Sequence, residues 1–239
     1  MTESLRNMLN SISASNVLDV ATGTGFFIEV MRDHLKKCDS ITGIDQKQFN
    51  EKTQPIFLEP GVNYQQMDAE HLLFPDHSFD LVSISNSLHH LPHPQTVLLE
   101  MDRVLNPGGK LLIFEMYNDH QTEKQLSHVL LHQWWGKIDT ALGVFHDPRF
   151  TRAELVNFLQ NCLTLDWQTC DIIQEEDDPE DEDFYQSLDS IIESYFAKAA
   201  PLVNAAALID EGKILKERIH SIGFRSATEL LAIGTKRMK

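Results

Sequence analysis

The chain has 239 residues, of which 42% are hydrophobic and 8% aromatic, so it is long enough for one large domain with a substantial core. Its formal net charge is −16, and such a charge repels the phosphate backbone that dominates nucleic-acid affinity. We therefore expect no nucleic-acid partner. No apolar run approaches the roughly 20 residues of a membrane helix, and the N-terminus lacks the pattern of a signal peptide. The expectation is a cytoplasmic protein without a membrane span.

Short apolar strands alternate with helices through the first half of the chain. Strands are expected at residues 16–20, 40–44, 62–67, 79–85 and 110–117. Helices are expected at residues 26–37, more weakly after Gln46, and at residues 96–105, where the apolar residues follow a 3.6-residue period. This alternation, with nearly continuous apolar strands, predicts a parallel sheet covered on both faces.

The second half of the chain is less regular. Thr151 and Glu154 have the spacing of a capping box, which predicts a helix start. A strand is expected at residues 165–173 and a final strand in "TELLAIGTKR". Between them, residues 174–224 predict an acidic linker followed by a helical insertion. The acidic run at residues 175–183 fits a solvated linker because like charges repel, and a metal or basic-partner site is the alternative.

The stretch "VLDVATGTGFF", residues 17–27, leads from a buried strand through two glycines into a helix. Ligands of open α/β sheets sit at the carboxyl ends of the strands, and glycine lets the backbone turn tightly and approach a ligand closely. The helix that follows offers free N–H groups to an anionic moiety. By itself the loop fits a dinucleotide, S-adenosylmethionine, or a tight turn with no ligand.

Two aspartates at the next strand ends narrow these alternatives. Asp45 lies twenty positions after the second glycine, where a carboxylate can accept hydrogen bonds from two ribose hydroxyls of any adenosine cofactor. Asp68 ends the third strand, where it can accept the adenine amino group while the Ala69 N–H meets the ring edge. The dinucleotide fingerprint requires a small residue where this chain has Ile28, so a nicotinamide-dependent oxidoreductase is disfavoured.

Four segments in order, "VLDVATGTG", "GID", "MDAEHLLFPDHSFDLVSISNSLHHL" and "RVLNPGGKLLIFE", together resemble class I S-adenosylmethionine-dependent methyltransferases. The resemblance is greatest to the small-molecule branch that includes the ubiquinone/menaquinone biosynthesis enzymes, and it covers roughly residues 16–117. It implies a Rossmann-like, doubly wound α/β sheet of seven strands, mostly parallel with an antiparallel last strand. The family usually has glycine where this chain has Ala21.

The resemblance also implies which residues bind the cofactor. The Asp19 side chain and the loop that follows would hold the methionine part, and the residues after the fourth strand would line the sulfonium end. The implied set is Asp19, Ala21, Thr22, Gly23, Thr24, Gly25, Asp45, Gln46, Asp68, Ala69, Asn86 and Leu88.

Histidines follow the fourth strand in "LHHLPHP". His89 and His90 are the candidate catalytic residues, as a general base or as groups that orient the acceptor; the alternative is that they cap the loop and pack on the next helix. We expect no metal site, because no cysteine or acidic ligand completes one at a recognisable spacing. His128 and His132 share one helical face, but without an HExxH pattern.

Residues 118–150 are expected to form a lid on the acceptor side, since this fold often builds its acceptor pocket there. The candidate pocket residues are Tyr117, Trp134, Trp135, Phe145 and His146. Aromatic side chains in this place would hold a flat or greasy acceptor, or would equally form the lid's own core.

The sequence thus predicts a single methyltransferase domain over residues 1–239 that transfers a methyl group from S-adenosylmethionine to a small-molecule acceptor. The sulfonium is a good leaving group, so the protein mainly has to align acceptor, methyl carbon and sulfur in line. The alternative is a non-catalytic, methyltransferase-like binding or partner protein, because only about fifteen residues precede the first strand. The oligomeric state stays open, with a homodimer among the alternatives.

Overall fold

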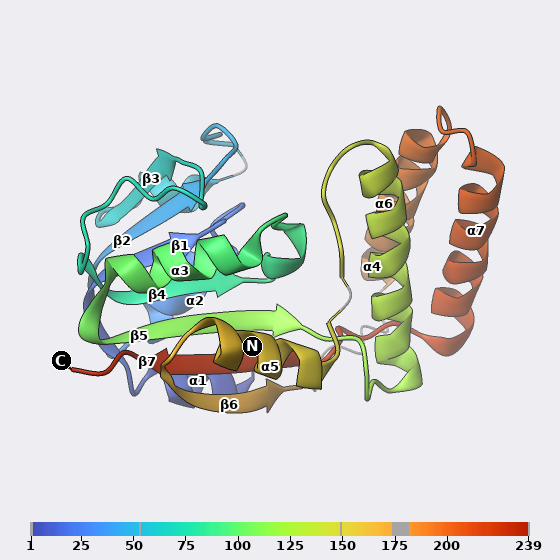
Figure 1. The fold of residues 1–239 in the computed structure, drawn as a ribbon. Coiled ribbons are helices and arrows are strands. Elements are labelled where there is room, and N and C mark those ends of the chain that lie inside the picture. Colours follow the sequence, from blue (N-terminus) through green and yellow to red (C-terminus); the bar gives the residue numbers. More distant parts are fainter. Residues whose placement is uncertain (1, 53, 149, 174–181, 239) are drawn as a thin grey trace.

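The computed structural model describes residues 2–52, 54–148, 150–173 and 182–238, so most of the acidic run lies outside the described residues. Seven strands form one sheet in the order β3-β2-β1-β4-β5-β7-β6 (Figure 1). The strands are β1 (Ser13–Val20), β2 (Lys37–Asp45), β3 (Val62–Gln66), β4 (Phe79–Ser85), β5 (Leu105–Met116), β6 (Asp166–Ile172) and β7 (Glu229–Thr235).

Only β7 runs against its neighbours in the described sheet. The pairs β1–β2, β1–β4, β2–β3 and β4–β5 are parallel, whereas β7 pairs in antiparallel fashion with both β5 and β6. The predicted seven-stranded, mostly parallel sheet with an antiparallel last strand is confirmed. The strand order also reverses beside β1, which is where open α/β sheets bind ligands.

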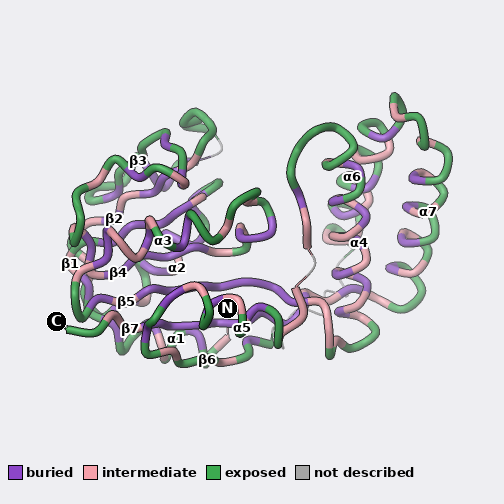
Figure 2. The backbone as a smooth tube through the Cα atoms, in the orientation of Figure 1, coloured by how far each residue is buried: buried purple, intermediate pink, exposed green. Residues whose placement is uncertain are grey.

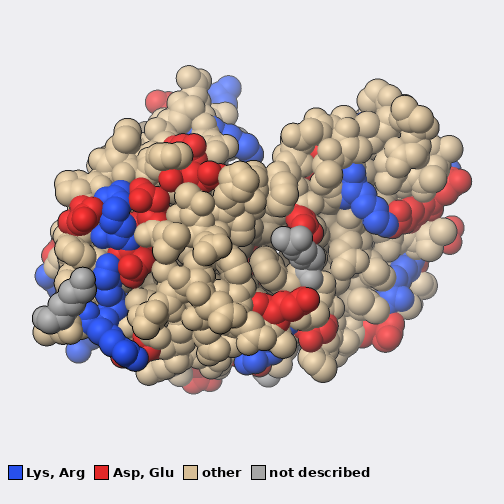
Figure 3. Space-filling model, viewed as in Figure 1, with Lys and Arg blue, Asp and Glu red and all other residues tan. Residues whose placement is uncertain are grey.

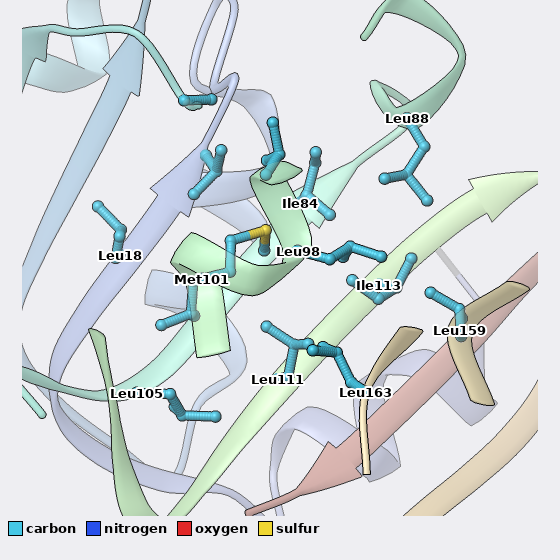
Figure 4. Close-up of a cluster of buried hydrophobic side chains, with 14 of the residues drawn as sticks. Leu18, Ile84, Leu88, Leu98, Met101, Leu105, Leu111, Ile113, Leu159 and Leu163 are labelled. Carbon is cyan, nitrogen blue, oxygen red and sulfur yellow. The ribbon is translucent and has the colours of Figure 1, made fainter. Parts of the chain in front are cut away.

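Helices cover both faces of the sheet, as the continuous apolar strands predicted. Helices α1 (Glu3–Leu9) and α2 (Phe26–His34) pack on one face. Helices α3 (Pro94–Val104) and α5 (Arg152–Cys162) pack on the other face. Successive strand residues point to opposite faces, so Val17 packs under α2 and Leu18 under α3. Figure 4 shows the α3 side of this core, and the central strands β1, β4, β5 and β7 are buried along most of their length (Figure 2).

A separate group of helices stands beside the carboxyl end of the sheet. Helix α4 (Glu123–Ala141) follows β5, and α6 (Glu182–Ala199) and α7 (Ala205–Ile222) lie between β6 and β7. The three helices share their own core of buried apolar residues and stand apart from the sheet in Figure 1. We call α4, α6 and α7 the helical unit. No described helix is both long enough and apolar enough to cross a bilayer.

Sequence expectations for individual elements were mostly met, with one correction. The capping box at Thr151 and Glu154 starts α5 as predicted. The weak helix expected after Gln46 was wrong: between β2 and β3 the described residues form only a short 3-10 helix, η1 (Pro55–Leu58). The reason is that apolar residues are too sparse there for a helical stripe, and Ile56 and Phe57 instead pack under the glycine loop.

Candidate functional site

The carboxyl ends of four parallel strands meet at one edge of the sheet. The strands β1, β2, β3 and β4 end at Val20, Asp45, Gln66 and Ser85. The helical unit flanks this edge, and the outline of the space-filling view is notched between the sheet and the helical unit (Figure 3). The residues that the sequence analysis assigned to the cofactor all come from this edge.

The loop between β1 and α2 has the backbone that its glycines predicted. Gly23 and Gly25 have φ angles of 54° and 85°, in the left-handed region that favours glycine. Ala21 also lies there, with φ of 53°, at the position where the resembling family usually has glycine. A Cβ atom on Gly25 would overlap the Ile56 side chain, so close packing as well as backbone conformation requires glycine at that position.

Asp19 lies fully buried beneath this loop, with 1% of its surface exposed. Its carboxylate accepts hydrogen bonds from the Ser83 hydroxyl at 2.6 Å and from the Thr22 hydroxyl at 2.7 Å. Burial raises the pKa of Asp19 to about 6, although both hydroxyls act to lower it, and repulsion from Asp45 raises it further. A cationic group placed beside Asp19 would relieve this cost and stabilise the ionised carboxylate.

Asp45 contacts the glycine loop directly. Its carboxylate accepts hydrogen bonds from the backbone N–H groups of Gly23 and Lys47, both at 3.0 Å. The Gln54 amide donates to the Gly23 carbonyl at 2.5 Å. The sequence analysis did not identify Gln54, and only its burial in an otherwise polar, exposed segment marks it. These contacts hold the Asp45 carboxylate against the loop at the end of β2.

The remaining cofactor candidates on β2 and β3 lie along the same edge. Gln46 is exposed, and its carbonyl accepts a hydrogen bond from the Gln66 side chain at 2.8 Å. Asp68 is exposed and its carboxylate accepts the Glu70 N–H at 3.0 Å, while Ala69 beside it is buried. The edge therefore presents carboxylates at the ends of three neighbouring strands.

Two candidates after β4 turn their side chains away from the edge. The Asn86 amide donates to Glu229 at 2.5 Å and accepts the Met116 N–H at 3.1 Å, which joins β4 to β5 and β7. Leu88 is buried in the apolar cluster on the α3 side of the sheet. Any contact of these two residues with a sulfonium is therefore left to their backbone. Between them, the Ser87 hydroxyl donates to the Ala21 carbonyl at 3.3 Å and ties this segment to the glycine loop.

His89 lies in the 3-10 helix η2 (Leu88–His90) and forms a buried pair with Glu115 of β5. The two side chains are 3% and 1% exposed, and His89 Nδ1 lies 2.6 Å from the Glu115 carboxylate. Glu115 also accepts the N–H groups of Ser87 and Leu88 at 3.1 and 2.8 Å. One carboxylate oxygen of Glu115 accepts these two backbone N–H groups, and the other faces His89 Nδ1. This arrangement favours the His89 tautomer that has its proton on Nδ1 and its lone pair on Nε2. Glu115 was not predicted from the sequence, although a lone carboxylate inside an apolar strand is a signal.

Four histidines from three segments meet beside this pair. They are His89 and His90 of η2, His132 of α4 and His146 of the loop after α4. One ring nitrogen from each lies within 4.8 Å of the others. The ring centroids of His89 and His90 are 4.2 Å apart, and those of His132 and His146 are 4.7 Å apart. We call these four residues the histidine cluster.

The loop that carries His146 is anchored on both sides. His146 Nδ1 lies 2.9 Å from the Asp139 carboxylate of α4, and Asp139 also accepts the Tyr195 hydroxyl of α6 at 3.1 Å. The Asp147 N–H donates to the His89 carbonyl at 2.8 Å. The cluster is thus held by the sheet and by the helical unit together.

Burial governs the protonation of the cluster. It lowers the pKa of His90 to about 3 and that of His132 to about 2, and it also lowers the pKa of His146. Repulsion among the neighbouring imidazoles acts in the same direction. These three rings are therefore neutral at pH 7, and each keeps a lone pair for a proton or a metal ion.

The aromatic residues proposed for an acceptor pocket are divided between two places. Tyr117 is buried and lines a small recess together with His89 and Phe150. Trp134 is completely buried in the core of the helical unit, where its Nε1 donates to the Leu208 carbonyl at 2.8 Å. That position matches the second alternative drawn from the sequence, a lid's own core.

Trp135 and Phe145 lie nearer the histidine cluster. The Trp135 ring stacks on Tyr195 of α6 at 5.4 Å between centroids and contacts the edge of the His132 ring at 5.9 Å. Phe145 is 40% exposed, so it contributes to the surface beside the cluster. Of the predicted pocket residues, His146 belongs to the histidine cluster and Trp135, Tyr117 and Phe145 lie beside it, whereas Trp134 lies in the core of the helical unit.

Comparison with known proteins shows what the part of the chain that carries this edge is similar to. Residues 18–113 match the family described as methyltransferase domain. The chain is 36% identical over 115 residues to a demethylmenaquinone methyltransferase of Porphyromonas gingivalis, and the match covers 46% of each protein. The chain spans about half the length of the curated relatives it matches. Residues 18–113 are therefore similar to a methyltransferase domain, in line with the resemblance that the motifs indicated.

Solved structures share the fold over nearly the whole chain. A phosphoethanolamine N-methyltransferase of Haemonchus contortus in complex with S-adenosyl-L-methionine superposes with a TM-score of 0.57 at 15% identity, covering 99% of this chain and 53% of that one. The [4+2]-cyclase SpnF superposes with a TM-score of 0.61 at 18% identity, covering 99% and 81%. One fold thus occurs in proteins named for different reactions, so the reaction has to be argued from the site.

Proposed function

We propose that this protein transfers a methyl group from S-adenosylmethionine to a small-molecule acceptor by in-line displacement. One observation carries the proposal: residues 18–113, the part that matches the methyltransferase domain, bring Asp19, the glycine loop, Asp45 and Asp68 to one edge of the sheet. That is the edge at which open α/β sheets bind ligands.

Each part of the edge has a proposed role. Asp19 and the loop from Ala21 to Gly25 hold the methionine part, and the ammonium of the cofactor relieves the burial of the Asp19 carboxylate. Asp45 and Gln46 accept the ribose hydroxyls, and Asp68 with the Ala69 N–H contacts the adenine. The backbone of Asn86 and Leu88 lines the sulfonium end.

The protein's own chemical contribution is alignment and proton transfer. Holding acceptor, methyl carbon and sulfur in line can supply roughly 7–11 kcal/mol of barrier reduction. His89 is the proposed general base, because Glu115 orients its ring and leaves the Nε2 lone pair free for an acceptor proton. A correctly placed base contributes about 10²–10⁴-fold in rate. His90, exposed at the outer side of the cluster, is the proposed group that orients the acceptor.

The acceptor site is proposed between η2, the loop that carries His146 and the recess beside Tyr117. The names of the curated relatives make demethylated quinones the first acceptors to assay. Residues outside 18–113 supply most of this side of the site, so other hydroxylated ring compounds belong in the same screen. We further propose a cytoplasmic protein with no nucleic-acid partner, because Lys and Arg number 20 against 36 Asp and Glu.

The first experiment is a calorimetric titration of the purified chain with S-adenosylmethionine, S-adenosylhomocysteine and NAD. Binding of the first two in the micromolar range, without binding of NAD, is the expected result. Binding of NAD alone would contradict the cofactor assignment. Binding of the first two without turnover of any acceptor would favour a non-catalytic, cofactor-binding protein.

A substitution at Asp45 tests the ribose assignment. Asp45→Ala removes the charge-assisted hydrogen bonds to the ribose. The free energy of binding S-adenosylhomocysteine is therefore expected to weaken by about 1.5–3 kcal/mol for each bond lost. Asp68→Ala is the matched variant at the next strand end, with a smaller expected loss because its carboxylate is exposed. Unchanged affinity of Asp45→Ala would remove the ribose role.

A further inference from the structure

We propose that His89, His90, His132 and His146 bind one divalent transition-metal ion, with Zn²⁺ as the first candidate. This inference goes beyond the proposed methyl transfer and does not depend on it. It reverses the expectation from sequence, which found no ligand spacing along the chain. The four ligands come from three segments, with His132 lying 42 positions after His90 and His146 lying 14 positions after His132, so no local ligand spacing reveals them.

Unsatisfied ring nitrogens are the first argument. His89 Nε2, His132 Nδ1 and His146 Nε2 are buried and have no hydrogen-bond partner among the described residues. His89 is 3% exposed and His146 is 5% exposed, so solvent does not readily supply the missing bonds. A buried polar atom without a partner costs about 1–3 kcal/mol. Three such atoms in one place indicate a ligand that bonds to all of them.

Distances are the second argument. The nitrogens of the four residues lie within 4.8 Å of one another. Four-coordinate zinc is tetrahedral and binds imidazole nitrogen at about 2.0–2.1 Å, so two nitrogens bound to one ion are about 3.4 Å apart. A contraction of up to about 1.4 Å in the longest of these distances, by rotation of the rings, would therefore bring the cluster to bonding distance.

The partners behind the rings are the third argument. Metal-binding histidines usually donate their other N–H to a carboxylate or a carbonyl group, which fixes the tautomer and aims the lone pair at the ion. His89 Nδ1 faces Glu115 at 2.6 Å, and His146 Nδ1 faces Asp139 at 2.9 Å. His90 forms a hydrogen bond with the Phe145 backbone. Three of the four rings thus have such a partner.

The ligand set selects the class of metal. Imidazole suits zinc, copper, iron and nickel, whereas magnesium and calcium require oxygen ligands. The buried Glu115 carboxylate and the partly buried Asp139 carboxylate would offset the charge of a divalent cation without bonding to it. His128, one turn before His132 on α4, is not part of the set, because its Nδ1 accepts the Ala227 N–H at 2.9 Å.

A metal here would join η2, α4 and the loop that carries His146, and so connect the sheet to the helical unit. It would also change the role proposed for His89. One lone pair on Nε2 can accept a proton or bind a metal ion, but not both. The base role therefore belongs to the metal-free protein, and with metal bound His89 positions the ion.

The test measures metal binding directly, on untagged full-length protein. After removal of bound metal with a chelator, Co²⁺ is titrated and the visible absorption of a low-symmetry, nitrogen-ligated Co²⁺ ion is recorded, followed by displacement with Zn²⁺. One equivalent with micromolar or tighter affinity is expected, together with a rise in Tm on Zn²⁺ addition. A wild-type protein that binds no stoichiometric Co²⁺ or Zn²⁺ would overturn the proposal, whatever the variants do.

Variants then locate the site. His132→Ala with His146→Ala is expected to lower Zn²⁺ affinity by more than about 100-fold, and Asp139→Asn by roughly 10–100-fold as an outer partner. His120→Ala, whose side chain is 82% exposed, is the control and should bind Zn²⁺ like the wild type. Circular dichroism of each variant checks folding. Equal Zn²⁺ affinity in a folded double variant and in the control would place any bound metal elsewhere and overturn the assignment. Calorimetry with S-adenosylhomocysteine tests the methyltransferase proposal separately.

Discussion

The carboxyl ends of β1, β2, β3 and β4, where we propose that the cofactor binds, are called the cofactor edge below. This edge and the histidine cluster lie side by side but are built in opposite ways. The cofactor edge uses residues at the ends of successive strands, and backbone groups and glycines make most of its shape. The histidine cluster uses side chains from η2, α4 and the loop after α4, and three of its four rings are oriented by a carboxylate or a backbone group. The first region follows from the local chain pattern, whereas the second exists only once the helical unit has packed.

This difference makes the two regions separable by mutation. Changes in the helical unit should alter stability and the histidine cluster but leave cofactor affinity intact. Changes at the glycine loop should lower cofactor affinity and leave the histidine cluster intact. The following variants test that separation.

Trp134→Ala should have the largest effect. It empties a fully buried site between α4, α6 and α7 and removes the hydrogen bond to the Leu208 carbonyl, so the free energy of unfolding should fall by about 3–5 kcal/mol. Affinity for S-adenosylhomocysteine should stay within a factor of about two, since Trp134 has no contact with the cofactor edge. Chemical denaturation and calorimetry measure the two quantities.

Trp134→Phe serves as the graded control. It keeps much of the apolar volume and loses only the N–H, so the expected cost is about 1–3 kcal/mol. If cofactor affinity falls in proportion to the loss of stability in both variants, the two regions are energetically coupled. That result would contradict the predicted separation.

Asp19→Asn should have an effect of about 3 kcal/mol that depends on pH. The pKa of Asp19 is raised in the folded protein, to about 6 from 3.8. The folded state therefore binds the proton more tightly, and stability falls as pH rises from about 4 to about 6. A shift of roughly two pKa units corresponds to about 3 kcal/mol at neutral pH. Asp19→Asn lacks this fall, so its stability relative to wild type should increase over that interval.

Asp80→Asn is the control with the opposite sign. Burial acts to raise the pKa of Asp80, but hydrogen bonds from Asn16, Asn106 and Ser15 leave it lowered overall. Its stabilising contribution is therefore present at neutral pH and lost as pH falls through the folded-state pKa. Denaturation curves between pH 3 and pH 7 measure both variants, and parallel pH profiles for Asp19→Asn and wild type would contradict the prediction.

The smallest expected difference is between two glycines in the same loop. Both have positive φ angles, so alanine at either position costs about 1–2 kcal/mol in backbone strain. Only Gly25→Ala adds overlap with Ile56, because nothing lies within 4 Å of a Cβ on Gly23. Gly25→Ala should be less stable than Gly23→Ala by about 1–3 kcal/mol. Equal stability of the two variants would contradict this prediction. It would mean that the Ile56 side chain can move away from the added methyl group at no energetic cost.

The fold and the placement of the candidate residues at the strand ends were predictable because their signals are local. Strand ends followed by glycine or aspartate can be read along the chain, and Asp19, Asp45 and the glycine loop lie where the motifs predicted them. The exception was the segment after Gln46, where Gln54 and η1 pack against the loop instead of forming a helix. The segment has too few apolar residues for the sequence to show that they pack against the glycine loop.

The histidine cluster was only partly predictable, because its geometry depends on contacts distant in sequence. His89 and His90 were identified from their place after β4, but His132 and His146 come together only through the packing of α4 and its following loop. Asp139 gave no signal, since an acidic residue on a helix is ordinary. Trp134 and Trp135 are adjacent in sequence, yet one lies in the helical core and the other borders the cluster.

The attachment of α6 and α7 to the sheet has an evolutionary consequence. They lie between β6 and β7, and the strands flanking them are direct neighbours in which Ile172 pairs with Glu229. The segment that contains α6 and α7 therefore leaves β6 and returns to β7 at one pair of facing residues. Related proteins could have longer, shorter or different insertions between β6 and β7 without any change in the register of β5, β6 and β7. The sequence of α6 and α7 is therefore constrained mainly by their packing on α4. It can change while the strands of the cofactor edge keep their sequence.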